Sequence, residues 1–289
     1  MPNLRDIKRR IKSVKNTQQI TKAMKLVSAS KLRRAQEAIL SARPYAIKLM
    51  DVLNHLSARC NHDAHPLLDD RDGKRWLILA ITADRGLCGG FNGSIIRKTL
   101  QVIDDNGDKE VQLIAAGKKG HAIFRNRDNK ILHDHSGWTK DFDYLKATEI
   151  GSTLGTLFSE KKVDRVYVLY NEFKSVMQQE VILEQLLPIV PETLDTGKGD
   201  MNVVDYIYEP EEEAILNTLL ERYMTVEVYR AFLESSASEH GARMTAMDSA
   251  SRNAGEMIGG LTLTYNKARQ AYITKELIEI VNGAEALKA

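Results

Sequence analysis

The chain has 289 residues, of which 43% are hydrophobic, and its formal net charge is +2. This hydrophobic content is enough for a buried core, and the near-neutral charge excludes a general polyanion binder. No run of about 18 apolar residues occurs, so no membrane span is expected. The two cysteines, Cys60 and Cys88, are too few for a disulfide framework. Together with the lack of a signal-peptide core, they favour a cytosolic protein of bacterial type.

The first predicted segment, residues 1–58, contains one long helix over residues 3–57. Asn3 is its expected N-cap, with Asp6 three residues later as in a capping box. An apolar seam at three- and four-residue spacing starts and then resumes one residue out of phase, which predicts a local change in supercoil winding. Its members are Leu4, Ile7, Ile11 and Val14, then Ile20, Met24 and Val27. Pro44 is expected to bend or interrupt the helix, and the alternative is two helices meeting near residues 41–44.

The N-terminal helix is also strongly basic. Residues 1–43 carry twelve Lys and Arg against two acidic residues, a net charge of +10. Residues 211–240 carry seven Glu against two Arg, a net charge of −5. Three interpretations fit the basic segment: a helix that contacts nucleic-acid phosphates, a solvated face, or a region that faces an acidic protein partner.

Residues 59–75 are polar and rich in turn-forming residues, and we predict a linker. Cys60, His62 and His65 could form part of a metal site, but no fourth ligand is evident. A solvated loop is therefore the favoured interpretation, and no metal is expected.

Residues 76–208 are predicted to form an α/β domain, because short apolar runs alternate with helical segments. The predicted strands are 76–81, 111–116, 163–170 and 177–188, with a weak strand near Ile131. The predicted helices are 94–104, 117–125 and 143–161. This order predicts a Rossmann-like parallel sheet whose last strand is an antiparallel edge.

Residues 209–289 are predicted to form a second long helix, with Pro210 and three glutamates at its start. An apolar period of 3.5 residues runs from Leu219 to Tyr272, interrupted only by Arg230, His240 and Ser251. Both long helices join the same domain, one leaving it and one entering, so we expect an antiparallel coiled coil. The second helix is longer by roughly 21 residues, so a tip on the order of 30 Å should project alone. Its apolar stripe predicts that another protein surrounds it.

A glycine-rich loop follows the first strand and invites a dinucleotide-binding interpretation. Its glycines, at 86, 89, 90 and 93, give G-x-x-G-G-x-x-G instead of G-x-G-x-x-G, and no acidic residue ends the second strand. We therefore expect no cofactor, and instead a tight turn with close backbone approach. Asp84 and Arg85 lie in this loop without a neighbouring nucleophile or histidine, so a local ion pair or an interface contact is favoured over catalysis.

Four stretches resemble one known family. They are residues 16–31 (NTQQITKAMKLVSASK), 84–92 (DRGLCGGFN), 242–247 (ARMTAM) and 265–277 (YNKARQAYITKEL). In this order they are similar to the gamma subunits of F-type, proton-translocating ATP synthases of the bacterial type, and the resemblance covers the whole chain.

This resemblance implies the central rotor shaft of the synthase, a non-catalytic part that couples proton flow to ATP synthesis at the beta subunits and regulates ATPase activity. The implied partners are three alpha and three beta subunits around the coiled coil, with the epsilon subunit and the c-ring at the α/β domain. The implied location is peripheral, at the cytoplasmic face of the bacterial inner membrane. No nucleic acid, cofactor or catalytic residue is implied.

The resemblance also implies interface residues. Met24 and Lys25 match the part of the first helix that faces an acidic loop of beta. Arg269 and Gln270 match the part of the last helix that meets beta's catch loops. Asp84, Arg85 and Cys88 match a loop near the base of the shaft that faces beta.

Two other classes of function remain as alternatives. One is a dinucleotide-dependent enzyme on the α/β domain with a coiled-coil oligomerisation arm. The other is a coiled coil that associates with nucleic acid. The first predicts nucleotide binding by the α/β domain, and the second predicts steeply salt-dependent binding to DNA or RNA.

Overall fold

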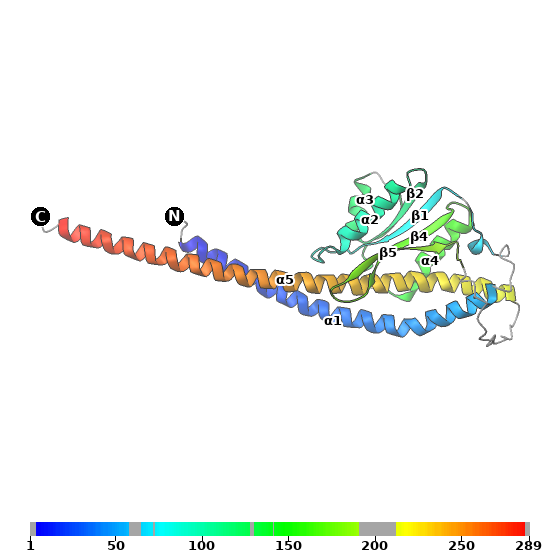
Figure 1. Ribbon diagram of the computed structural model, residues 1–289, viewed down its shortest axis with the longest axis horizontal. Helices are drawn as coiled ribbons and strands as arrows, with labels where there is room; N and C mark the ends of the chain where they lie inside the picture. The colour runs from blue at the N-terminus through cyan, green and yellow to red at the C-terminus, as the bar shows by residue number, and fades with distance from the viewer. Residues whose placement is uncertain are drawn as a thin grey trace. The chain divides into compact units, whose positions relative to one another are not determined.

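The computed structural model describes residues 4–57, 65–71, 73–127, 130–140, 142–190 and 212–286 (Figure 1). A sheet domain lies between two long helices in the sequence, as predicted. The elements are α1 (Leu4–Ser57), the 3-10 helix η2 (Pro66–Leu68), β1 (Arg75–Ile81), α2 (Phe91–Asp105), β2 (Glu110–Ala116), α3 (Lys118–Arg125), β3 (Ile131–His135), α4 (Tyr144–Ser159), β4 (Arg165–Phe173), β5 (Gln179–Leu187) and α5 (Glu212–Ala286). The predicted N-cap Asn3, the cysteine at 60, His62 and Pro210 lie outside the described residues.

The chain divides into two compact units that are described separately. Unit 1 contains Met1–Ser28 and Arg243–Ala289, and unit 2 contains Ala29–Ala242. Each unit therefore holds a part of both long helices. The segment boundaries predicted from sequence follow the elements, and as a division into domains they stay a prediction.

The sheet of unit 2 has the strand order β3-β2-β1-β4-β5. Strand β1 pairs in parallel with β2 and β4, and β2 pairs in parallel with β3. Strand β5 pairs with β4 antiparallel, so the predicted antiparallel edge is confirmed. The parallel connections run through helices, as crossovers between parallel strands require.

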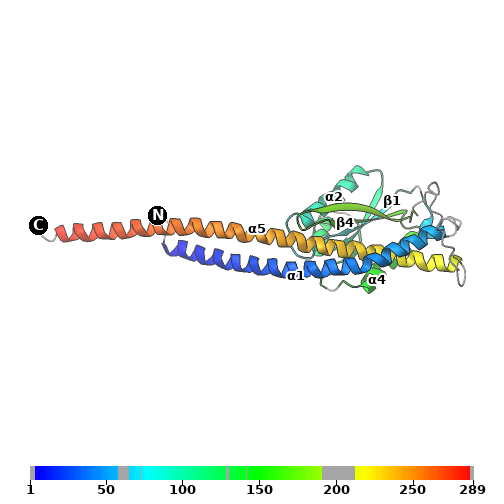
Figure 2. The same ribbon diagram turned by 60° about the horizontal axis from the view of Figure 1, so that its bottom comes forward.

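Both faces of the sheet are covered, which explains the uninterrupted apolar run of β1. Ile78 and Ala80 face a cluster that includes Ile95 of α2 and Phe124 of α3. Leu77, Leu79 and Ile81 face the opposite cluster, to which α4, α5 and the end of α1 contribute. Figures 1 and 2 show α2 and α4 on opposite sides of the sheet. Because successive side chains of a strand alternate between faces, every residue of β1 from Leu77 on needs an apolar side chain or a small one.

Helix α1 continues through Pro44 without interruption, so the two-helix alternative is wrong. Its ribbon curves over the light-blue part (Figure 1). A proline has no N–H to donate to the carbonyl four residues before it. Pro44 is exposed, so that carbonyl can face solvent and the helix can continue with a bend.

The predicted phase slip of the α1 seam is also wrong. Ile20 and Val27 are 60% and 57% exposed, whereas Thr21 and Ser28 are buried. The seam instead keeps its spacing of three and four residues by using polar side chains, and its inward positions in unit 1 are Leu4, Ile7, Ile11, Val14, Gln18, Thr21, Lys25 and Ser28. Small hydroxyls fit this seam because they bond to their own helix: the Thr21 hydroxyl donates to the carbonyl of Gln18 at 3.0 Å.

Candidate interaction sites

In unit 1, the start of α1 pairs with the middle of α5 in antiparallel fashion. The Lys25 ammonium lies 2.5 Å from the Asp248 carboxylate, and the Gln18 amide donates to the Ser251 carbonyl at 3.3 Å. The partner number on α5 rises as the number on α1 falls, so the helices run in opposite directions. The α5 seam is confirmed in this unit, since Met244, Met247, Ser251, Ala254, Ile258, Leu261, Tyr265 and Ala268 are all at least partly buried.

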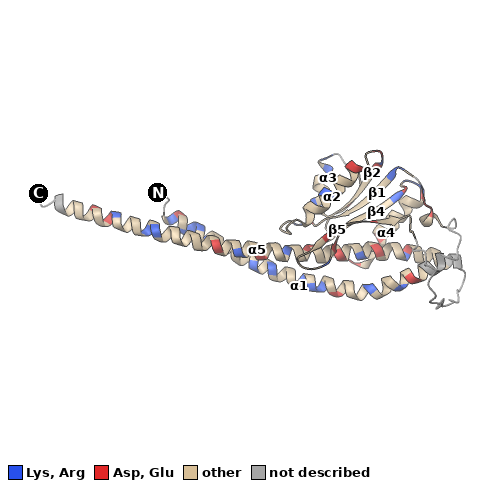
Figure 3. Cartoon of the chain, in the orientation of Figure 1, with Lys and Arg blue, Asp and Glu red and all other residues tan. Residues whose placement is uncertain are grey.

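The predicted interface residues Met24 and Lys25 lie at the edge of this pair. Met24 is half-buried, and the Lys25 ammonium is bonded to Asp248, whose pKa it lowers. The sequence alone did not show this internal partner. The other basic residues of α1 in unit 1 are exposed; they are Arg5, Lys8, Arg9, Arg10, Lys12, Lys15 and Lys22. Figure 3 marks Lys and Arg positions in blue along this part of α1. A basic face therefore remains free of the coiled-coil seam.

The C-terminal part of α5 has no partner from α1 (Figure 1). Every residue from Arg269 to Ala284 is exposed, and Tyr272, the last seam position predicted from sequence, is 53% exposed. The side chains of Arg269 and Gln270 form no hydrogen bond or ion pair with the rest of the described chain. Beyond them, an apolar row is open to solvent, with Ile273 46%, Leu277 58% and Ile280 67% exposed. Contiguous apolar surface of this kind marks an interaction site.

The Asp84 carboxylate connects its own loop with the start of α3 and with the loop after β3, at the carboxyl edge of the sheet. It accepts hydrogen bonds from the backbone amides of Lys118 (3.1 Å), Gly137 (2.7 Å) and Thr139 (3.2 Å), and from the Thr139 hydroxyl (2.6 Å). Burial alone would raise the pKa of Asp84, but these hydrogen bonds together lower it. The local ion pair, one of the two expectations for Asp84 and Arg85, does not form, because the partners of Asp84 lie at the start of α3 and in the loop after β3.

The loop after Asp84 has one buried side chain that packs against the domain and two side chains that are exposed to solvent. Cys88 is 2% exposed and packs with Ala83, Phe91 and Ala242. Arg85 is exposed and forms no ion pair among the described residues. Leu87 is 64% exposed and has a φ of 64°, a left-handed conformation that costs a non-glycine residue roughly 1–2 kcal/mol. The structure thus buries one predicted interface residue, Cys88, and leaves Arg85 accessible.

The predicted tight turn is present, with Gly89 at a φ of 56°, but Gly90 and Gly93 do not provide the predicted close backbone approach. A Cβ at Gly93 would meet nothing within 4 Å, and at Gly90 only the Ser94 hydroxyl at 3.7 Å. The close approach occurs at Gly117 and Gly120, which lie against Thr82 where β1 meets β2 and α3. A Cβ at Gly117 would lie 2.0 Å from the Thr82 carbonyl oxygen, and Gly117 also has a φ of +93°. The close backbone approach therefore lies outside the motif.

A polar network fastens α5 to the antiparallel edge of the sheet. The Arg230 guanidinium donates to both oxygens of Glu184 on β5, at 2.6 and 2.7 Å, and lies 2.6 Å from Glu227. The Tyr170 hydroxyl of β4 donates to Glu184 at 2.9 Å. Burial raises the pKa of Glu227 although Arg230 opposes this shift. Arg230 was recognised in the sequence as an exception to the seam, and these carboxylates explain it.

Two further bonds connect α5 to β4. The Glu234 carboxylate accepts from the Phe173 backbone amide at 2.9 Å, and the Ser238 hydroxyl donates to the Asn171 carbonyl at 3.0 Å. Glu234 and Ser238 were not singled out in the sequence. A glutamate and a serine four residues apart on a helix share one face, but only the position of β4 shows that this face is buried.

The possible metal site considered around His65 is the last of the sequence candidates. The His65 ring accepts a hydrogen bond from the Leu67 amide at 3.1 Å and caps η2. Across the residues that the structure describes, no group of three or more His, Cys, Asp or Glu side chains is arranged to hold a metal ion. Within the same residues, no helix has the length and apolar character needed to cross a membrane.

Comparison with known proteins agrees with this architecture. The ATP synthase family model matches residues 3–287, so the chain belongs to the ATP synthase family. Within that family it belongs with the gamma chains. It is 50% identical over 290 residues to the ATP synthase gamma chain of Geobacter sp. (strain M21), covering 100% of both chains. It is 52% identical over 293 residues to that of Anaeromyxobacter sp. (strain Fw109-5), again covering 100% of both.

Solved structures show the same fold. A chain of the Tetrahymena thermophila mitochondrial ATP synthase central stalk and c-ring is 28% identical with a TM-score of 0.59, over 80% of this chain and 99% of that one. A chain of the Euglena gracilis mitochondrial ATP synthase, from its OSCP/F1/c-ring assembly, has a TM-score of 0.73 at 21% identity, over 98% of this chain and 94% of that one. The gamma-chain resemblance seen in the sequence is thus confirmed along the full length.

Proposed function

We propose that this chain is the central rotor shaft of a proton-translocating ATP synthase and carries no catalytic site of its own. The observation that carries the proposal is the exposed tip of α5 beyond Ala268. A helix with a bare apolar row is stable in water only if its surroundings cover that row, so it calls for a surrounding protein. A ring of alpha and beta subunits would supply this cover.

The charge distribution supports an acidic partner around the same unit. The exposed basic side chains of α1 attract an acidic surface over several ångströms without a fixed contact geometry. Such loose complementarity suits a shaft that must turn, because a tightly paired interface would oppose rotation. In this proposal Met24, Lys25, Arg269 and Gln270 face the beta subunits.

The bonds between α5 and the sheet suit the transmission of torque. A shaft must not slip against the domain that is driven, and Arg230, Glu234 and Ser238 hold α5 to strands β4 and β5. We place the epsilon subunit and the c-ring at this α/β domain, and Asp84, Arg85 and Cys88 in a loop near beta. The complex would be peripheral at the cytoplasmic face of the bacterial inner membrane, where the shaft would couple proton flow to synthesis and regulate ATPase activity.

Substitutions at the tip test the proposal. Arg269→Ala and Gln270→Ala should lower proton-driven ATP synthesis by the assembled synthase in membrane vesicles, without changing the thermal unfolding of the chain. Arg97→Ala, which removes an exposed arginine from α2, is the matched control. Normal synthesis in both tip variants would refute their interface role, and purification of the native chain without alpha and beta subunits would refute the rotor itself.

A further inference from the structure

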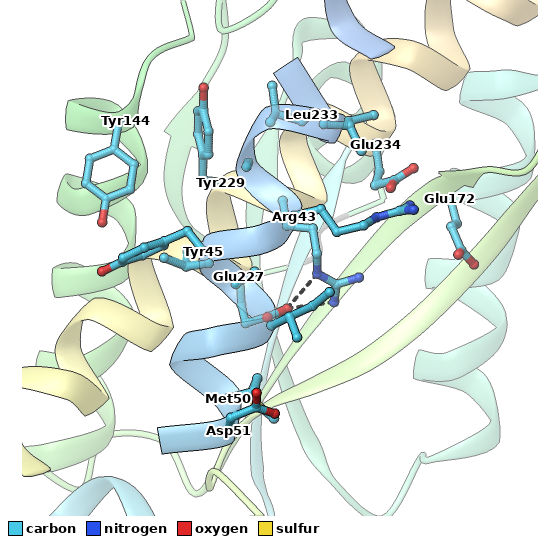
Figure 4. A pocket seen from close by; sticks show the side chains of 16 residues that line it. Arg43, Tyr45, Met50, Asp51, Tyr144, Glu172, Glu227, Tyr229, Leu233 and Glu234 are labelled. Carbon is cyan, nitrogen blue, oxygen red and sulfur yellow. Dashed lines mark hydrogen bonds and ion pairs between the residues drawn. The ribbon is translucent and has the colours of Figure 1, made fainter. Parts of the chain in front are cut away.

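A cavity of about 580 Å³ lies between α1 and α5 in unit 2 (Figure 4). This volume is within the range of small-molecule sites, roughly 300–1,000 Å³. Most of its wall is apolar, with Ile39, Ala42 and Met50 from α1 and Val226 and Leu233 from α5. The two helices are therefore not closely packed here, and the space between them can hold a small, mostly apolar molecule.

Carboxylates outnumber cations in the lining of this cavity. Asp51, Glu172, Glu227 and Glu234 contribute four carboxylates, against the two guanidinium groups of Arg43 and Arg230. Three of these carboxylates form ion pairs. Glu227 pairs with Arg230, Glu172 pairs with Lys174 at 2.8 Å, and Asp51 pairs with Lys48 at 3.1 Å.

Glu234 is different from the other three carboxylates. It is 7% exposed, and one of its oxygens accepts from the Phe173 amide. Among the described residues its other oxygen has no hydrogen-bond partner. The Arg43 side chain extends towards Glu234 in Figure 4 and forms no ion pair with it. This free oxygen still reaches solvent in the cavity, because the fully buried side-chain atoms without a partner in the described residues belong to other side chains. Burial of the rest of the side chain raises the pKa of Glu234.

Three tyrosines lie at the other end of the cavity. Figure 4 shows Tyr45, Tyr144 and Tyr229 away from Glu234 and Glu172. The rings of Tyr144 and Tyr229 meet edge to face, with centroids 5.6 Å apart. Aromatic faces bind aromatic rings and organic cations. The cavity thus has an aromatic end, an apolar middle and an end with an unsatisfied carboxylate oxygen.

The geometry points to a binding site for a small organic cation, an amine whose ammonium donates to the free oxygen of Glu234 and whose aromatic body lies among the tyrosines and aliphatic side chains. Nothing in the rotor role requires this site, and the inference stands independently of it. An anion is disfavoured by the excess of carboxylates, and a fully apolar molecule would leave the Glu234 oxygen without a donor.

The test compares 4-phenylbutylamine with its uncharged counterpart 4-phenylbutan-1-ol, using the full-length chain. Binding is followed by calorimetry and by the ¹³C-methyl resonance of Met50, which lines the cavity. The amine should bind about tenfold more tightly than the alcohol, because a charged donor to a buried carboxylate is stronger than a neutral one. Equal binding of both, or no saturable binding of the amine, would overturn the inference.

Variants locate the site. Glu234→Gln keeps an acceptor for the Phe173 amide and removes the charge, so it should abolish the preference for the amine and leave binding of the alcohol within about twofold. Ala42→Phe fills the cavity and should abolish binding of both compounds. Glu256→Gln, an exposed site on α5 outside the lining, should change neither. If the native chain self-associates and Ala42→Phe prevents this, a second copy fills the cavity and the small-cation site is refuted.

Discussion

Replacement of Asp84 separates a structural role from an interface role. Asp84→Ala removes the acceptor for three backbone amides and one hydroxyl, which come from Lys118 at the start of α3 and from Gly137 and Thr139 in the loop after β3. A hydrogen bond to a charged group contributes roughly 1.5–3 kcal/mol, but the site is only half-buried and water can replace some of these bonds. We expect the substitution to lower the free energy of unfolding by about 2–4 kcal/mol.

The measurement is thermal unfolding of the purified chain, monitored by near-UV circular dichroism of the α/β domain. For a domain of this size, each kcal/mol shifts Tm by roughly 2–4 °C, so Asp84→Ala should lower Tm by about 4–16 °C. Asp84→Asn retains one acceptor oxygen and should lie between the native chain and Asp84→Ala. Asp108→Ala removes an exposed carboxylate that is paired only with its neighbour Lys109, and it should change stability by less than about 0.5 kcal/mol.

The pH dependence provides a second measurement on the same variant. The folded-state pKa of Asp84 is lower than its unfolded-state pKa, so the unfolded chain binds a proton at this carboxylate at a higher pH than the folded chain does. The contribution of Asp84 to stability is complete above an unfolded-state pKa of about 3.9 and is lost as the pH falls through the folded-state value. Asp84→Ala should therefore lose less stability than the native chain between neutral pH and this acid range. An Asp84→Ala chain that melts like the Asp108→Ala control, but does not assemble with beta, would refute the structural role.

Three further predictions concern other polar contacts and glycines. Arg230→Met should lower the free energy of unfolding in urea by about 2–3 kcal/mol, less than for a fully buried charge pair because a third of the arginine is exposed; an unchanged midpoint would contradict the network. Gly117→Ala should cost more than about 3 kcal/mol or prevent folding, whereas Gly93→Ala, in a helix with open space, should be neutral or gain up to about 1 kcal/mol. A double-mutant cycle of Lys25→Ala and Asp248→Ala should give a favourable coupling that decreases with added salt. Zero coupling at low salt would show that the pair does not form in solution.

Periodicity in the sequence determined the order of the elements, the parallel sheet with its antiparallel edge, and the seam of α5 as far as Ala268. These features are encoded by apolar side chains whose spacing follows the helix or the strand, and burial of those side chains is the dominant favourable term in folding. The difference in helix length likewise indicated an unpaired tip, and the exposed residues from Arg269 on agree with it.

Only the tertiary structure decided which polar residues are buried and which groups they contact. The α1 seam passes through Gln18, Thr21 and Ser28, which an apolar pattern cannot detect, and so the sequence indicated a phase slip that does not exist. Asp84 and Glu234 likewise gain their roles from amides that lie far away in sequence. A polar side chain is stable inside a protein only where a partner meets it, and the position of that partner is a property of the folded chain.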